Sequence, residues 1–183
     1  MEICNLIELV LLLSCLGSFS WATIYYFNKS KERNIRQKIF LLCVYIIGTL
    51  HILGVSFDNQ INPDATLIAT ILYLLSLWVF WSAVRAVGSG GLRLFFDGVE
   101  PDRLVMQGPY RLIRHPFYSS YLLCWLAGVV ATGELLLLPT ILLAAILYTL
   151  AAKSEEKTLL AAQFSEHYAK YKSSTGMFWP KFI

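Results

Sequence analysis

Five long apolar segments limit the folds that are open to this chain. They cover residues 6–27, 39–57, 65–87, 117–132 and 135–152. A helical span needs about 20 apolar residues, and fewer where the bilayer thins locally. Backbone groups in lipid must be hydrogen-bonded internally, so runs of this length predict helices and not the short alternating strands of a barrel. The sequence predicts an all-α, polytopic membrane protein with about five transmembrane helices.

Composition agrees with a bilayer as the solvent. Of the 183 residues, 57% are hydrophobic and 15% charged, whereas soluble domains have about 45–50% apolar and about 25% charged residues. The net charge of +3 is explained by basic loops beside a membrane, so we expect no nucleic-acid partner. The four cysteines are isolated in or beside apolar runs, and we expect neither a metal site nor a disulfide framework.

The loops predict the orientation. Residues 28–38 (NKSKERNIRQK) are strongly basic, whereas residues 58–65 (DNQINPDA) contain two Asp and neither Lys nor Arg. Lys and Arg are retained on the cytoplasmic side, so we expect the N-terminus outside, and residues 85–116 and the tail after residue 152 in the cytoplasm. The first segment reads as a retained span and not as a signal peptide, because Glu2 and Glu8 stand where basic residues belong.

The length predicts a single domain of residues 1–183, with three spans in residues 1–87 and a more polar half in residues 88–183. That half contains a helical hairpin at 117–152, whose turn is TGE, and a tail at 153–183. Ser154 is expected to cap an amphipathic tail helix. One face of this helix would carry Glu156, Leu160, Phe164, Tyr168 and Tyr171. Such a helix either docks on the core or lies on headgroups with Glu156 in solvent.

The stretch GPYRLIRHPFY at residues 108–118 concentrates polar groups at the start of an apolar run. Pro116 is suited to the first turn of a helix, so Arg114 and His115 fall at a helix N-terminus, where free N–H groups and an arginine can bind an anion. Alternatively, the arginines are cytoplasmic anchors, and the nearby tyrosines, Tyr121 among them, form an interfacial aromatic belt. Taken singly, the residues fit this second interpretation better.

Two longer stretches together resemble a known family. They are LVMQGPYRLIRHPFYSSYLL and, after a short hairpin, EEKTLLAAQFSEHYAKYKSSTGMFWPKF. This pattern resembles the C-terminal half of the isoprenylcysteine carboxyl methyltransferase family and its prokaryotic relatives, with which phospholipid methyltransferases share the R-H-P-x-Y core. The resemblance covers residues 102–182, and the first three spans match only as generic hydrophobic helices.

The resemblance implies that S-adenosylmethionine binds in a cytoplasmic pocket under a C-terminal lid at residues 153–183. The implied cofactor contacts are Leu104, Val105, Tyr110, His115, Pro116, Phe117, Tyr118 and Glu156. These residue types suit the ligand. Tyrosine rings cover a base or a sulfonium, a carboxylate accepts from hydroxyls or an ammonium group, and His115 or helix N–H groups meet the carboxylate.

The resemblance also implies a lipophilic acceptor that arrives from the bilayer and meets the cofactor near Arg114 and Glu156. The first expectation is O-methylation of a prenylcysteine-like carboxylate. The arginine that commonly stands four residues before the carboxylate in this family is here Ala152, with Lys153 beside it. Either Lys153 supplies the positive charge in its place, or the acceptor is not the carboxylate that the arginine would recognise.

Three alternatives remain open at this point. A phospholipid or other lipid amine would need a base, for which Glu155, Glu156 and His115 are the candidates. A sterol-type membrane reductase would bind NADPH through a comparable basic segment. A membrane scaffold would use the polar loop to bind a partner and would have no enzymatic activity.

Overall fold

A computed structural model describes residues 3–26, 35–57, 63–88, 103–163 and 165–181. The long helices are α1 (Ile3–Trp21), α2 (Ile35–Phe57), α3 (Pro63–Val87), α4 (Pro116–Thr132), α5 (Leu138–Ala161) and the shorter α6 (Ser165–Ser174). A π-helical turn, η1 (Ala22–Tyr26), extends α1, and 3₁₀ turns form η3 (Gly108–Arg111) and η4 (Leu135–Leu137). The described part of the chain contains no strand, which confirms the all-α prediction.

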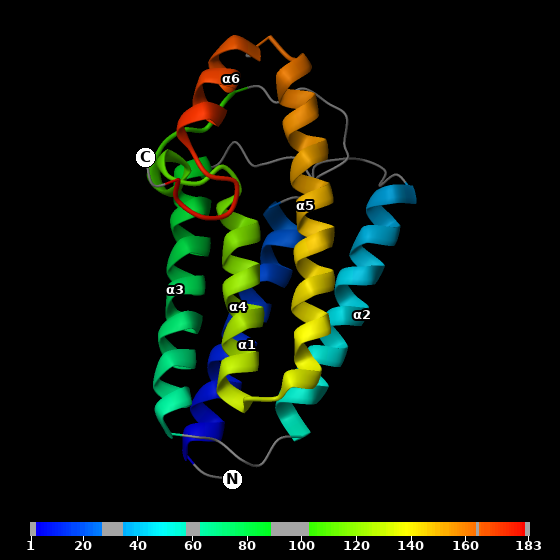
Figure 1. Ribbon diagram of the computed structural model, residues 1–183, viewed down its shortest axis with the longest axis vertical. Coiled ribbons are helices and arrows are strands. Elements are labelled where there is room, and N and C mark those ends of the chain that lie inside the picture. The colour runs from blue at the N-terminus through cyan, green and yellow to red at the C-terminus, as the bar shows by residue number, and fades with distance from the viewer. Residues whose placement is uncertain (1–2, 27–34, 58–62, 89–102, 164, 182–183) are drawn as a thin grey trace.

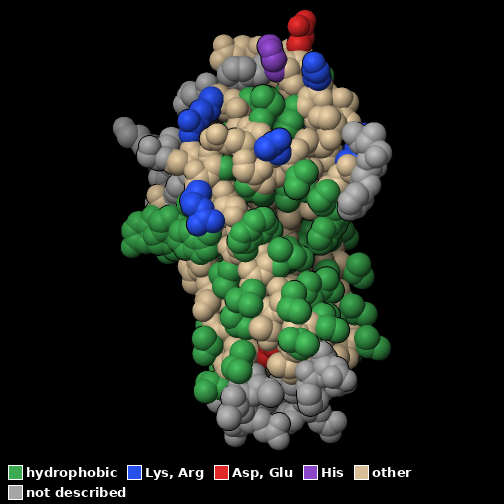
Figure 2. All heavy atoms as spheres, turned by 90° about the vertical axis from the view of Figure 1, so that its left-hand side faces the viewer, with side chains coloured by type: hydrophobic (Ala, Val, Ile, Leu, Met, Phe, Trp, Pro, Cys, Tyr) green, Lys and Arg blue, Asp and Glu red, His purple; other side chains and the backbone are tan. Residues whose placement is uncertain are grey.

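Four segments are long and apolar enough to cross a membrane: Leu6–Tyr25, Ile35–Ser56, Ala65–Val87 and Leu135–Ala161. The helix Pro116–Thr132 is apolar but shorter. Large apolar side chains such as Leu42, Trp78 and Leu142 are exposed along these helices, whereas soluble proteins rarely expose apolar patches of this extent. On the face drawn in Figure 2, apolar side chains surround the lower part, and basic side chains gather at the end that carries α6. The chain is a multi-pass membrane protein.

The long helices form one bundle, in which α3 packs along α4, α1 packs on α3 and α4, and α2 packs on α5 and α4. The last turns of α1, α3 and α5 and the first turns of α2 and α4 lie at the same end as α6 (Figure 1). The first turn of α1 and the α4–α5 turn lie at the opposite end (Figure 1). The polar segments that flank α4 and α5 thus share one end of the molecule, as the loop count predicts.

The tight hairpin predicted at TGE is present. Gly133 ends α4 in the left-handed region, with φ 67°, a conformation that glycine adopts without steric cost. The Glu134 carboxylate then accepts a hydrogen bond from the backbone N–H of Leu136 and caps the next turn. These local contacts reverse the chain within a few residues and set α5 antiparallel to α4.

The predicted start of the tail helix at Ser154 is wrong. Ser154 lies inside α5, which continues without a break to Ala161 and ends where Ala162 adopts an extended conformation. The residues around Ser154 are mostly good helix formers, and no glycine or proline interrupts them, so the helix continues past its apolar part. The predicted stripe is therefore divided, with Glu156 and Leu160 on α5 and Tyr168 and Tyr171 on α6. Phe164 lies outside the described residues.

Candidate functional site

The backbone before α4 is held by the C-terminal tail. The N–H of Arg114 donates to the Gly176 carbonyl at 2.9 Å, and the N–H of His115 donates to the Met177 carbonyl at 3.1 Å. In return, the Gly176 N–H donates to the Leu112 carbonyl at 3.2 Å. Pro116 then occupies the first turn of α4, as predicted. The tail thereby fixes the direction of the two polar side chains that precede the helix.

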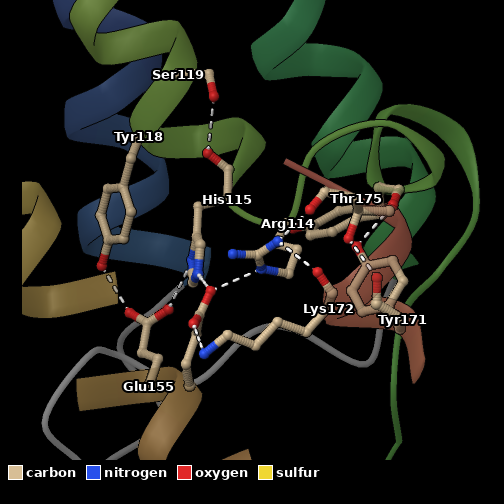
Figure 3. A network of polar contacts seen from close by, with 10 residues as sticks. Arg114, His115, Tyr118, Ser119, Glu155, Tyr171, Lys172 and Thr175 are labelled. Carbon is tan, nitrogen blue, oxygen red and sulfur yellow. Dashed lines mark hydrogen bonds and ion pairs between the residues drawn. The ribbon is translucent and has the colours of Figure 1, made fainter. Parts of the chain in front are cut away.

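Glu156 is the centre of a buried ion-pair network. Its Oε1 lies 2.7 Å from Nε of Arg114 and 3.3 Å from Nε2 of His115, and its Oε2 lies 2.7 Å from Nζ of Lys172. The Arg114 guanidinium also donates to the carbonyls of Lys172 and Thr175. Figure 3 shows how the side chains converge from the segment before α4, from α5 and from α6. The network joins these three segments.

His115 bridges the two neighbouring carboxylates. Its Nδ1 lies 3.3 Å from Oε2 of Glu155, and its ring stacks on Tyr118 with 5.7 Å between ring centroids. Burial by itself would lower the pKa of His115, but the hydrogen bonds to Glu155 and Glu156 outweigh it and raise the pKa above the ordinary value. The charged imidazolium is therefore favoured between two anions.

Glu155 differs from Glu156 in what it touches. Its Oε1 accepts a hydrogen bond from the Tyr118 hydroxyl at 2.6 Å. Its side chain is 31% exposed, whereas that of Glu156 is 3% exposed. One carboxylate is thus enclosed by cations, and the other keeps surface that a ligand can reach.

A cavity of about 400 Å³ opens beside the network. Among the predicted site residues, it is lined by Leu104, Val105, Tyr110, Arg114, His115, Pro116, Phe117 and Tyr118. Glu155 also lines it. Of the other two predicted residues, Glu156 lies in the network behind this wall, and Lys153 is exposed on α5. The structure therefore brings together all of the predicted site residues except Lys153.

Helix α6 covers one end of the cavity. Tyr168 and Tyr171 are buried and line it, and the Tyr171 hydroxyl donates to the Tyr110 carbonyl at 2.6 Å. This burial favours docking on the core over a helix that lies on headgroups. Leu160 does not share the packing, because it is 41% exposed at the end of α5.

Two tyrosines complete the aromatic wall of the cavity. Tyr148 stacks on Tyr118 with ring centroids 5.2 Å apart, and Tyr121 lies 5.5 Å from Tyr148. Sequence reasoning placed Tyr121 only in an interfacial belt and did not single out Tyr148. A signal for Tyr148 existed, since it precedes Glu155 by two helical turns and so shares its face.

These residues fit S-adenosylmethionine by their chemistry. Small-molecule sites measure about 300–1,000 Å³ and combine apolar walls with a few polar groups, and this cavity has both. Aromatic faces suit a base or a sulfonium, and the accessible carboxylate suits hydroxyls or an ammonium group. Glu155 is better exposed for that contact than Glu156, which already binds three basic side chains.

The sequence matches a known family over more than half of its length. Residues 64–167 match the phospholipid methyltransferase family, a range that includes Arg114, His115 and both carboxylates. The chain is also similar to the cobalt-zinc-cadmium resistance protein CzcN of Cupriavidus metallidurans, with 32% identity over 119 residues. That alignment covers 64% of this chain and 53% of CzcN, so the chain spans about half the length of this relative. Because the family match covers more than half of the sequence, the chain belongs to the phospholipid methyltransferase family.

Proposed function

We propose that the protein transfers a methyl group from S-adenosylmethionine to a lipophilic acceptor. The observation that carries this proposal is the single cavity on which the R-H-P-x-Y residues and Glu155 converge, in a chain of this family. Besides Glu155, the proposed cofactor site consists of Leu104, Val105, Tyr110, His115, Pro116, Phe117, Tyr118 and Glu156.

The cofactor, when bound, supplies a methyl group that is already activated on a sulfonium, so the protein contributes position and exclusion of water. In this proposal Tyr110 and Tyr118 cover the apolar and cationic parts of the cofactor. Glu155 accepts from its polar groups. Arg114 and Glu156 act by holding the tail and α6 over the cavity, which keeps water from the reacting atoms.

The proposal names two candidate classes for the methyl acceptor. A prenylcysteine-like carboxylate is the first candidate and would need no base. Lys153 was predicted to face this carboxylate, but its exposure on α5 gives that role no support. A phospholipid or other lipid amine is the second candidate, and Glu155 is the group best placed to accept its proton.

Purified protein with radiolabelled S-adenosylmethionine tests the proposal. We expect retention of the label, and transfer to farnesylcysteine or to phosphatidylethanolamine identifies the acceptor class. Glu155→Gln should lower kcat for an amine more than for a carboxylate, whereas the exposed Glu166→Gln on α6 should change neither. Retention of NADPH in place of S-adenosylmethionine would favour the reductase, and retention of neither would favour the scaffold.

A further inference from the structure

The cavity extends well beyond the ion-pair network. Its lower part, which is the part farther from α6, runs between α1, α2 and α4. This part is lined mainly by apolar side chains, among them Leu12, Leu16, Val44, Ile52 and Trp125. Phe19 of α1 packs edge-on against Tyr121 with centroids 4.5 Å apart. This contact joins the aromatic wall beside Glu155 to the apolar lower part.

The lower part reaches deep into the bundle. From Tyr118 to Trp125, both of which line the cavity, α4 rises about 10 Å. From Phe40 to His51 on α2, also lining residues, the rise is about 16 Å. The cavity is thus deeper than the polar site beside the ion-pair network needs to be. Its apolar walls suit an alkyl chain.

A close contact between helices forms the floor. His51 is 1% exposed, its Nδ1 lies 2.8 Å from the Thr140 hydroxyl on α5, and its ring packs edge-on against Trp125. A Cβ at Gly128 would overlap the His51 ring, and a Cβ at Gly54 would overlap Leu137. The two glycines therefore let α2 approach α4 and the η4 turn near His51, and the cavity ends there.

The side of the cavity lies between α1 and α2. Helix α1 packs on α3 and α4, and α2 packs on α5 and α4, so the cavity separates the two. Both helices expose apolar side chains on their outer faces, for example Leu13 and Leu50. An alkyl chain that enters between α1 and α2 thus stays in apolar surroundings throughout.

We propose that the lower part of the cavity binds the alkyl chain of the acceptor, and that Gly48 sets the longest chain accepted. This rests on the proposed methyl transfer. Gly48 lines the cavity on α2, and a Cβ there would lie 3.5 Å from Cη2 of Trp125, an ordinary contact. A larger side chain at this position projects into the space above the floor without displacing the backbone.

Gly48→Leu tests the length limit. The assay uses S-alkylcysteines and alkylamines with octyl, dodecyl or hexadecyl chains, and each buried methylene adds about fourfold to affinity. We expect the variant to bind S-adenosylhomocysteine normally, to keep octyl turnover within about twofold and to lose about tenfold or more in kcat/KM for hexadecyl through KM. The matched control is Leu50→Phe on the lipid-facing side of α2, which should leave all three chains unchanged.

Equal losses for all chains, or the same length dependence in the control, would overturn the proposal. A hexadecyl amphiphile with a photoactivatable diazirine at the chain end gives a readout that does not need turnover. We expect it to label Trp125 or His51 in the parent protein and not in Gly48→Leu. Labelling of the cavity without methyl transfer would refute the proposed function but support the alkyl-chain site. Methyl transfer with labelling confined to lipid-facing residues would refute the alkyl-chain site alone.

Discussion

Glu155 and Glu156 are adjacent in the chain, but their different surroundings indicate different roles. Glu156 is enclosed by Arg114, His115 and Lys172, whereas Glu155 meets the Tyr118 hydroxyl and the cavity. A buried carboxylate with three basic partners is expensive to change, because a partner left unpaired costs several kcal/mol. Glu156 is thus best understood as a positioning residue, and Glu155 as the one that a ligand meets.

We expect His115→Ala and Glu156→Gln to weaken cofactor binding by roughly ten- to hundred-fold, the loss of a hydrogen bond to a charged group. The first variant removes a cavity wall, and the second loosens the tail over the cavity. Calorimetric titration with S-adenosylhomocysteine measures both. His167→Ala on the exposed side of α6 is the control, and unchanged affinity in both site variants would contradict the site assignment.

Stability should depend on pH through His115. Its folded pKa is raised above the ordinary value of 6.5, so its contribution is fully present below about pH 6.5 and is lost as pH rises through the folded pKa. We expect Tm to decrease as pH rises through the folded pKa of His115. The decrease should be smaller in His115→Gln than in the parent protein. Thermal unfolding across pH 5.5–9 measures this. If His115→Gln keeps the full pH dependence while His167→Gln loses it, the attribution to His115 is wrong.

At the scale of elements, α6 and the tail form a lid that is held by both side chains and backbone. Tyr168 and Tyr171 are buried, Lys172 reaches Glu156, and residues 176–177 pair with the segment before α4. These contacts come from parts of the chain far apart in sequence, so the lid depends on the whole polar end.

Hydrogen exchange should show residues 165–178 protected, and more strongly so with S-adenosylhomocysteine, because a ligand that binds the closed state stabilises it. Lys172→Ala should raise exchange in α6 by removing the 2.7 Å contact to Glu156. Lys170→Ala, exposed on the same helix, should not. Fast exchange throughout α6 in the parent protein would show that the lid is open in solution.

At the scale of the whole molecule, the predicted orientation can be tested directly. Positive-inside counting puts α6 in the cytoplasm and the α4–α5 turn outside. In a variant without its native cysteines, Leu136→Cys, exposed in that turn, should react with a membrane-impermeant maleimide in intact cells. Lys170→Cys should react only after lysis. The reverse pattern would invert the orientation and put the cavity mouth outside.

Local signals in the sequence are enough to predict the helices, the hairpin and the family. Apolar runs must satisfy their own backbone in lipid, and Pro116 and Gly133 act through local conformation, so these features need no distant partner. The spacing of the R-H-P-x-Y and Glu-Glu stretches likewise indicates the family. Where the apolar signal stopped at residue 152, however, the sequence did not show that α5 continues to Ala161.

Which side chains meet depends on long-range packing, which the sequence does not show. Arg114 and Glu156 are far apart in sequence, and which of two adjacent carboxylates faces the cations depends on the rotation of α5 relative to the segment before α4. Packing between helices also placed Tyr148 beside Tyr118 and left Lys153 exposed. The depth of the cavity depends on Gly128 and His51, whose close approach joins different helices. Helical periodicity defines a face on each helix, but the contacts that choose its neighbour are long-range, and no local pattern encodes them.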